Sequence, residues 1–442
     1  MRATIRLLPL VATAALVCNA QGPTSASPPA TPQRLTVQDA EALAVKNNPQ
    51  ISVAHLLSLS SLQVTRQQKA AYYPTVYGSI TAAEPRNEGS RIAAGYLNNP
   101  IVYQRAAGGV ALSQLLTDFG RTNNLVAAAA LRAKAADMNA AATAAQIKLA
   151  VDQAFYNALE ANAELMVARQ TVEARKAVSE QVTALFNNKL KSQLDVSFAS
   201  ANLSQANLLL LDAQNAYQAS LSVLSELLGY TTQQQYDLVE GDSQLSPPPD
   251  AVGPLIDQAF ANRPEIAAQG FEVEASQRFQ KAERDLLLPS IQALGVVGRT
   301  AASESIAGIS VFSSWYGAVG VNMNIPIFNG FLYPARAKEA SLRSQAEQER
   351  LRELRDHVAS DVRTSWLNSQ TAYRRIAVTQ QFVVQTTLAV DLSQTRYQLG
   401  LASIVELSQA QLQQTEAQIQ NAAAKYQYRI AQEVMRFQIG AP

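Results

Sequence analysis

Few residues in this sequence of 442 amino acids are of the kinds that catalyse reactions or bind metal ions. It contains two histidines, His55 and His357, and one cysteine, Cys18. Both histidines fall in expected helices, and neither has a second ligand at the spacing of a metal site. No catalytic triad or phosphate-binding loop stands out, since Gly108-Gly109 is the entry to an expected strand. We therefore expect a protein that is not an enzyme and that has no cofactor and no metal site.

Two turns within helical segments look alike although they lie far apart in the chain. The first, FNNKLKSQLDVSFAS, starts at Phe186, and the second, YQLGLASIVELSQAQ, starts at Tyr397. They share a serine and an acid at an offset of 211 residues: Ser192 and Asp195, then Ser403 and Glu406. The sequence therefore contains two copies of one kind of turn, which we expect to serve related purposes.

The repeated turns belong to a duplication of the whole chain. The segment AVKNNPQI at 44–51 recurs as AFANRPEI at 259–266, and Gly229 matches Gly440. Each copy is expected to contain two entry helices, two strands, a very long helix, a turn and a final helix. The sequence divides into a first structural repeat, 35–229, a linker, 230–250, and a second structural repeat, 251–440.

The N-terminus has the pattern of an export signal. Arg2 and Arg6 precede an apolar run that ends near Cys18 and is too short to cross a bilayer as a helix. We assign residues 1–20 to this signal and the Pro/Ser-rich residues 21–34 to a disordered linker. Cys18 is a candidate for lipidation, although the residues before it depart from the usual lipidation pattern.

Composition and charge exclude several classes of protein. The formal net charge is +1, so nothing indicates binding to nucleic acid. After the signal, no segment has about twenty consecutive apolar residues, as a membrane-spanning helix would need. Only 16% of the residues are charged, and alanine is abundant, which favours long helices with small contacts. The two longest are expected at about 120–187 and 331–399, each about 100 Å long.

Four segments alternate between apolar and polar residues with period two, as membrane β-strands do. The clearest apolar row contains Val319, Val321, Met323, Ile325 and Ile327. The expected strands cover about 75–83, 108–117, 290–299 and 316–327. A sheet in lipid must close on itself, and four strands are fewer than the eight of the smallest barrels. Closure therefore needs several chains, and three copies would supply twelve strands above a tube of long helices.

The sequence after the signal resembles the TolC family of outer-membrane efflux channels over nearly its whole length. The resemblance is carried by the duplicated plan, the two turns, LSQLLTDFGR at 112–121 and MNIPIFNGF at 323–331. It implies a mainly α-helical fold with membrane β-strands, in which antiparallel coiled-coil helices form an α-helical barrel below a twelve-stranded β-barrel. It also implies a homotrimer in the outer membrane with a periplasmic tunnel. Such channels export solutes together with a periplasmic adaptor and an inner-membrane RND or ABC transporter.

The resemblance assigns roles to residues near the turns, which form the tips of the tunnel in this family. Tyr397 and Asp195 match a phenol–carboxylate hydrogen bond that holds the family's entrance closed. Ala402 stands where the family has the arginine of a second latch, and Leu194 stands at that arginine's partner position. The resemblance therefore implies a single latch, formed by Asp195 and Tyr397.

Further roles follow for the acids and the turns themselves. Glu406 matches the first of two family acids that ring the tunnel entrance, and Gln409 replaces the second, so a less electronegative entrance is expected. The candidate adaptor contacts are the two tip turns: Lys189, Leu190, Lys191 and Ser192, then Gly400, Leu401, Ala402 and Ser403.

Other interpretations of these residues stay open at this point. Asp195 and Tyr397 could serve only in capping and packing, while Glu406, Lys189 and Lys191 could be solvated surface residues. A soluble sheet with one buried face would also show alternating strands. The alternative function is that of a secreted coiled-coil structural protein or adhesin without transport activity. The sequence does not identify the exported substrate.

Overall fold

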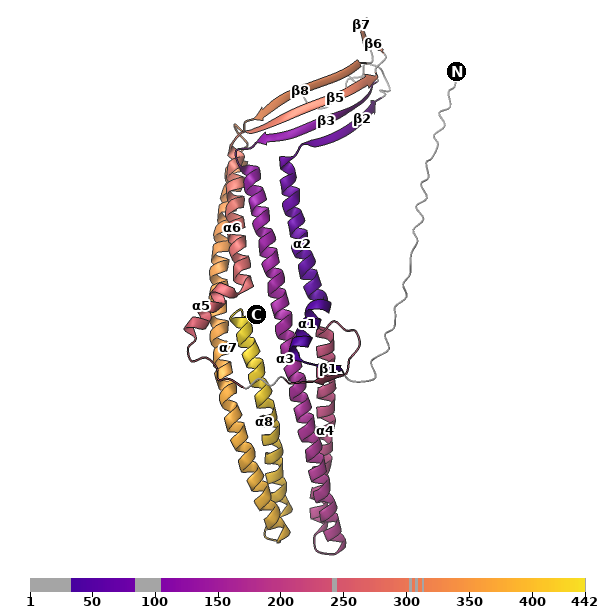
Figure 1. Ribbon diagram of the computed structural model, residues 1–442, viewed down its shortest axis with the longest axis vertical. Helices are drawn as coiled ribbons and strands as arrows, with labels where there is room; N and C mark the ends of the chain where they lie inside the picture. The colour runs from indigo at the N-terminus through magenta and orange to yellow at the C-terminus, as the bar shows by residue number, and fades with distance from the viewer. Residues whose placement is uncertain are drawn as a thin grey trace, which may run out of the picture.

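The computed structural model of the protein describes residues 33–83, 105–240, 245–301, 304–306, 309–311 and 314–441. The molecule is elongated, with a β-sheet at one end and two helical hairpins at the other (Figure 1). The first repeat comprises α1 (Val37–Asn47), α2 (Pro49–Lys69), β2 (Thr75–Ala83), β3 (Arg105–Thr117), α3 (Arg121–Asn187) and α4 (Gln193–Leu227). The second comprises α5 (Gly253–Asn262), α6 (Pro264–Arg284), β5 (Ser290–Ala301), β8 (Ser314–Asn324), α7 (Leu332–Gln398) and α8 (Ile404–Gln438).

Short elements complete the chain. The strands β1 (Gln33–Leu35) and β4 (Tyr236–Leu238) pair in parallel, and β6 (Glu304–Ile306) pairs with β7 (Ile309–Val311). Two single turns of 3-10 helix, η1 (Ala70–Tyr72) and η2 (Asp285–Leu287), precede β2 and β5.

The equivalent long helices of the two repeats have the same length. α3 and α7 contain 67 residues each, and α4 and α8 contain 35 each. At 1.5 Å per residue, each of the longest helices extends about 100 Å, from the sheet to the hairpin tips (Figure 1). The duplicated, mainly helical fold with two long strands per repeat is confirmed. No helix in the described ranges is both long enough and apolar enough to cross a membrane.

The four long strands form one antiparallel sheet in the order β2-β3-β5-β8. Apolar side chains on one face of this sheet are uncovered, above all Ile80 and Val319, each 93% exposed. β2 and β8 are the edges of this sheet in the described chain, so the outer side of each is free to pair. The sequence led us to expect that the last strand runs to about 327. It ends at Asn324, because Pro326 has no N–H to donate to a neighbouring strand.

Each pair of entry helices is tied to the end of the last helix of its repeat. Asn48 accepts a hydrogen bond from the backbone N–H of Gln50 at 2.9 Å, which caps α2. Its side-chain amide donates to the carbonyl of Leu227 at 2.9 Å, at the C-terminus of α4. In the second repeat Arg263 takes this place and donates to Gln438 Oε1 at 2.7 Å, at the end of α8. The entry helices thus hold the ends of α4 and α8 beside the long helices, midway along the molecule (Figure 1).

Two glycines allow the close packing at this level. Gly229 and Gly440 follow α4 and α8 with φ angles of 83° and 68°. A Cβ at Gly229 would lie 2.8 Å from the carbonyl oxygen of Asn47, and one at Gly440 would lie 2.9 Å from the backbone nitrogen of Arg263. Any other residue would combine backbone strain with a collision at these two positions.

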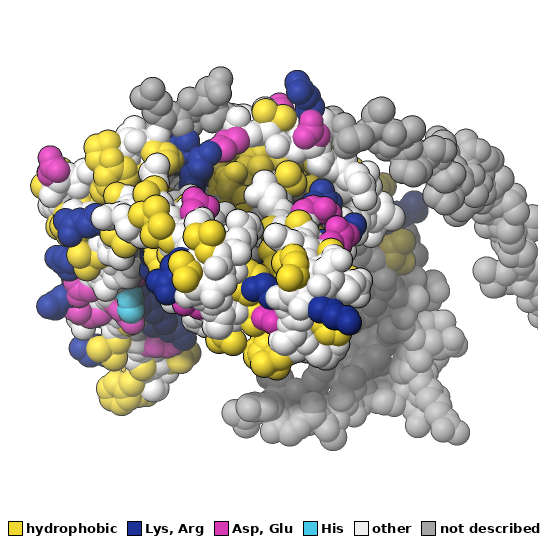
Figure 2. Space-filling view, turned by 90° about the horizontal axis from the view of Figure 1, so that it is seen from below, with side chains coloured by type: hydrophobic (Ala, Val, Ile, Leu, Met, Phe, Trp, Pro, Cys, Tyr) yellow, Lys and Arg dark blue, Asp and Glu magenta, His cyan; other side chains and the backbone are white. Residues whose placement is uncertain are grey.

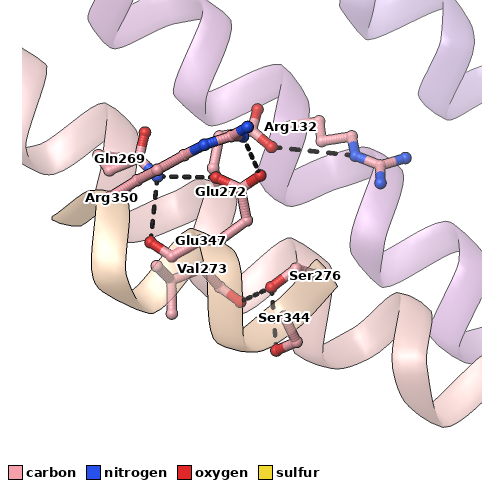
Figure 3. A network of polar contacts seen from close by, with 8 residues as sticks. All are labelled: Arg132, Gln269, Glu272, Val273, Ser276, Ser344, Glu347 and Arg350. Carbon is pink, nitrogen blue, oxygen red and sulfur yellow. Dashed lines mark hydrogen bonds and ion pairs between the residues drawn. The ribbon is translucent and has the colours of Figure 1, made fainter. Parts of the chain in front are cut away.

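Polar contacts join the helices nearer the sheet, where α3 presents small side chains. Figure 3 shows one such layer between α3, α6 and α7. The Gln269 amide donates to the Glu347 carboxylate at 2.9 Å, and Arg132 lies 4.0 Å from Glu272. Small residues let helix backbones approach closely but bury little apolar area. Polar pairs of this kind therefore set the relative heights of the helices.

One carboxyl group is buried where α1, α3 and α8 meet. Asp152 is 7% exposed, and its Oδ1 has no hydrogen-bond partner among the described residues. Burial, and next the negative charges of Glu41 and Glu433, raises the pKa of Asp152 to about 8. Arg436 opposes this effect only in part. Asp152 is therefore largely protonated at neutral pH.

Replacement of Gly229 by alanine should destabilise the protein. The left-handed backbone and the contact with Asn47 together should cost at least about 2 kcal/mol of unfolding free energy. Gly270→Ala is the matched control, because Gly270 lies within α6 with nothing within 4 Å of its added Cβ. Alanine there should stabilise by about 0.5–1 kcal/mol. Thermal unfolding of the detergent-purified variants measures both effects, and equal shifts for the two would contradict the proposed close contact.

The stability of the protein should fall through Asp152 as the pH rises from acid to about 8. A carboxyl group whose pKa is higher in the folded than in the unfolded chain loses its stabilising effect between the unfolded value, 3.8, and the folded value, about 8, above which the loss is complete. Asp152→Asn should remove this loss, so the variant should melt higher than the wild type at pH 9 but not at pH 5. Asp212→Asn, on an exposed site of α4, is the control. An unchanged pH dependence in Asp152→Asn would contradict the assignment.

Candidate functional site

The two hairpins end in turns with the same backbone geometry. Residues 188–192 join α3 to α4, and residues 399–403 join α7 to α8. Lys189 and Gly400 adopt the left-handed conformation at equivalent places, with φ angles of 60° and 72°. Backbone hydrogen bonds of 2.9 Å and 2.8 Å close the two turns in the same way. Glycine adopts this conformation freely, whereas lysine is strained there by about 1–2 kcal/mol.

The acids that follow the two turns have different partners. Asp195 Oδ2 accepts hydrogen bonds from the Ser192 hydroxyl at 2.6 Å and the Ser192 N–H at 3.0 Å. Ser192 in turn accepts from the Asp195 N–H at 3.2 Å, which completes a capping box at the start of α4. Ser403 caps α8 by accepting from the Glu406 N–H at 3.3 Å. The Glu406 carboxylate does not close a capping box, and it lies 3.5 Å from Arg396.

A lysine from the first turn contacts a tyrosine at the end of α7. Lys191 Nζ lies 3.7 Å from the centroid of the Tyr397 ring and 3.4 Å from the Tyr397 carbonyl oxygen. Tyr397 is only 5% exposed, because it packs in a small apolar cluster shared by both hairpins. The cluster contains Val182, Ala199, Tyr397, Ile404 and Leu407. The tips of the two repeats thus form one unit within the chain.

The structure brings Asp195 and Tyr397 together but does not join them by a hydrogen bond. Burial, and next the charge of Asp195, raises the pKa of Tyr397 to about 12. Burial raises the pKa of Asp195, but the bonds from Ser192, the charge of Lys191 and the nearby Tyr397 hydroxyl outweigh it and hold this pKa below its usual value. Nevertheless, the buried Tyr397 Oη has no hydrogen-bond partner among the described residues. The two groups are electrostatic neighbours, and Ser192 donates to one oxygen, Oδ2, of the carboxylate.

The expected entrance residues lie on α8 above the second turn. Glu406 is about half exposed and faces Arg396, which offsets its charge. Gln409 lines a groove of about 720 Å³ between α4 and α8, together with apolar residues such as Phe198 and Leu412. Of the two positions where the resemblance implies acids, one holds Glu406, whose charge Arg396 partly offsets, and the other holds the neutral Gln409.

The outer surface of the tips is largely apolar. Leu190, Leu399 and Leu401 are each 68% exposed, and Leu194 is 65% exposed. Lys189 is also exposed. Figure 2 views the molecule from this end and shows hydrophobic side chains among basic and acidic ones. Exposed leucines in such a turn suit contact with another protein better than contact with water.

Sequence analysis missed a buried polar pair that joins the hairpins above the tips. Arg175 of α3 donates a hydrogen bond from Nη1 to Gln411 Oε1 of α8, 236 residues away. Arg175 is 8% exposed, and burial lowers its pKa to about 10, so it stays charged at neutral pH. Asn202 of α4 also donates a hydrogen bond to the Ser408 hydroxyl of α8 at 2.6 Å, at a level between the Arg175–Gln411 pair and the tips. Nothing in the local sequence distinguishes Arg175 from the other basic residues.

The other residues considered for lipidation or metal binding lie away from the tips or outside the described residues. Cys18, the candidate lipidation site, lies outside the described residues. His357 lies 3.9 Å from Glu353 on the surface of α7. Within the described ranges, no group of three or more His, Cys, Asp or Glu side chains is placed to hold a metal ion.

Comparison with known proteins places this geometry in context. The family described as "Outer membrane efflux protein" matches residues 42–230 and 255–441. The outer membrane efflux protein BepC of Brucella suis is 24% identical over 82% of this chain and 76% of its own length. The outer membrane protein TolC of Escherichia coli is 24% identical over 63% of this chain and 58% of its own length. The solved structure of the outer membrane protein VceC from Vibrio cholerae superposes with a TM-score of 0.77 at 19% identity, covering 91% of this chain and 96% of VceC.

Removal of the two serine caps should have unequal effects. Ser192→Ala breaks a reciprocal capping box, which should cost about 1 kcal/mol and speed amide exchange in the first turn of α4 about fivefold. Ser403→Ala removes a single, longer bond and should have a smaller effect at the start of α8. Hydrogen–deuterium exchange at neutral pH measures both. Equal acceleration in the two variants would show that the Asp195 carboxylate adds nothing to the cap.

Proposed function

The chain belongs to the outer membrane efflux protein family, and we propose that three copies of it form one channel for the export of solutes. It is an outer-membrane protein whose long helices form a periplasmic tunnel, and its family and fold are those of a channel rather than of an enzyme. The number of chains in the assembly, its partners and the roles of the tip residues are the parts we propose.

The observation that carries the trimer is the open four-stranded sheet. Its edges β2 and β8 have backbone groups that lipid cannot satisfy, so the sheet must close on other strands. Its uncovered apolar face, with Val319 and Ile80 fully accessible, suits contact with lipid. Four strands are half of the smallest known barrel, and three chains supply twelve. The same threefold arrangement would surround a lumen with the hairpins of three chains.

We propose that the tips meet a periplasmic adaptor, which in turn connects the channel to an inner-membrane transporter of the RND or ABC type. The 67 residues of α3 span about 100 Å between the sheet and the tips, which supports a position of the tips deep in the periplasm. Exposed Leu190, Leu401 and Lys189 offer an apolar surface with one positive charge for this contact. The names of relatives support export as the shared function.

We also propose that the tips form the closed end of the tunnel. The apolar cluster around Tyr397 and the nearby Asp195 hold the two hairpins of a chain together at this end. Glu406 copies from three chains would approach the tunnel axis, with Arg396 reducing their mutual repulsion. Gln409 adds no charge to this ring. An entrance with weak cation preference follows from this arrangement.

The alternative of a secreted coiled-coil structural protein has no support beyond the long helices. It does not account for an amphipathic sheet in every chain, and the matching family is one of efflux proteins. A soluble sheet with one buried face is also disfavoured, since no described element covers the apolar face of β2 and β8.

Channel formation should depend on the lipid face of the sheet. We expect detergent-extracted wild type to have the mass of a trimer and to give discrete current steps in planar bilayers. Val319→Arg places a charge on the uncovered face and should abolish outer-membrane assembly, since arginine in mid-bilayer costs about 2–4 kcal/mol per chain. Asn322→Arg, on the opposite face of β8, is the matched control and should assemble. Normal assembly of Val319→Arg, or a monomeric wild type without currents, would refute the proposed trimeric barrel.

A further inference from the structure

Lys191 of the first tip turn contacts the end of α7. Its ammonium group lies 3.7 Å from the centroid of the Tyr397 ring, well within the range of a cation–π interaction. The same nitrogen lies 3.4 Å from the Tyr397 carbonyl oxygen. The two partners are 206 residues apart and belong to different repeats. One side chain therefore bridges the first turn and the end of α7.

The position of Lys191 also suits the end of α7 electrostatically. The Tyr397 carbonyl is among the last carbonyls of this helix and points out of its C-terminus. Cations stabilise helix C-termini, where partial negative charge accumulates. Lys191 thus acts as a capping cation supplied by the neighbouring hairpin, while Asp195 on its own hairpin balances its charge.

The Tyr397 hydroxyl lies beside the Asp195 carboxylate, but no hydrogen bond of normal geometry joins the two groups. Asp195 Oδ2 already accepts two hydrogen bonds from Ser192, at 2.6 Å and 3.0 Å. The Tyr397 Oη is buried and has no hydrogen-bond partner among the described residues. The cap of α4 uses Asp195 Oδ2. The contact with Lys191 is made by the ring and the carbonyl of Tyr397.

Resting on the channel proposed above, we propose that Lys191 is a gate residue: it clasps Tyr397 and keeps the first hairpin closed against the second. Opening of the tunnel withdraws the ammonium group from the ring. Each chain has a single clasp, because the equivalent position in the second repeat is Ala402, 211 residues later. Three clasps then hold the entrance of the trimer. This role replaces adaptor contact as the function of Lys191, whereas Lys189 remains free for such contact.

The test compares single-channel currents of five variants in planar bilayers. Lys191→Met and Tyr397→Leu each remove the clasp and should raise the open-to-closed ratio about fivefold or more, as expected for the loss of a cation–π contact. Lys191→Arg and Tyr397→Phe keep a cation and a ring and should conduct like the wild type. Lys176→Met is the control, because it removes an exposed lysine of α3 about three helical turns before the tip.

A double variant separates gating from general damage to the tip. Tyr397→Leu combined with Lys191→Met should conduct no more than either single variant, because both remove the same interaction. Additive effects would refute a direct clasp. The proposal is also overturned if Tyr397→Phe opens the channel while Lys191→Met does not, since the phenol would then be the latch. If even the wild type gives no currents in bilayers, the channel proposal fails and the clasp fails with it.

Discussion

The long helices approach one another through small side chains, and the rest of the structure depends on this close approach. The buried residues of α3 nearest the sheet are mostly alanines, among them Ala128, Ala129, Ala133 and Ala135. Alanine contacts bury little apolar area. They let two helices approach closely but do not favour one offset along the helix axis, that is, one relative height. Polar pairs between the helices favour one relative height, such as Arg132 with Glu272, 4.0 Å apart near the sheet. In the lower half, the pairs that join the two hairpins serve the same purpose.

The duplication supplies one backbone twice, and the differences between the copies carry the function we propose. The left-handed residue of the turn is a strained lysine in one repeat and a glycine in the other. The acid after the turn closes a capping box in the first repeat but faces an arginine in the second. Lys191 has only Ala402 as its counterpart. Because the two tips differ, Lys191 of the first hairpin can hold the entrance closed although the second hairpin has no equivalent lysine.

The single chain forms a closed apolar core at its middle, whereas its two ends have uncovered apolar surface or unpaired strand edges. Around the entry helices, a core with Phe155, Leu224 and Leu228 is closed by the chain itself. The sheet, in contrast, has open edges and an uncovered apolar face, and the tips expose several leucines. Unpaired strand edges and exposed apolar surface are both costly, and for this reason we propose that other chains and lipid cover these two ends.

The sequence by itself determined most of the long helices and strands, because their signals lie in near neighbours in the chain. Proline and asparagine mark the start of α2, alternation marks the strands, and a serine three residues before an acid marks each final helix. The end of β8 was placed too far along because the apolar row continues past Pro326, where pairing stops. The matching of the two repeats also needs only the sequence, since it compares residues rather than contacts.

Only the tertiary structure decided which side chains meet across the hairpins. Arg175 and Gln411 are 236 residues apart, and Lys191 and Tyr397 are 206 apart. The sequence offered Tyr397 and Asp195 as partners, but it could not show that Asp195 Oδ2 accepts from Ser192 and that Lys191 covers the ring of Tyr397. The physical reason is that helices with alanine-rich faces pack at many relative heights. A shift of one helical turn, about 5.4 Å, would give every one of these side chains a different partner.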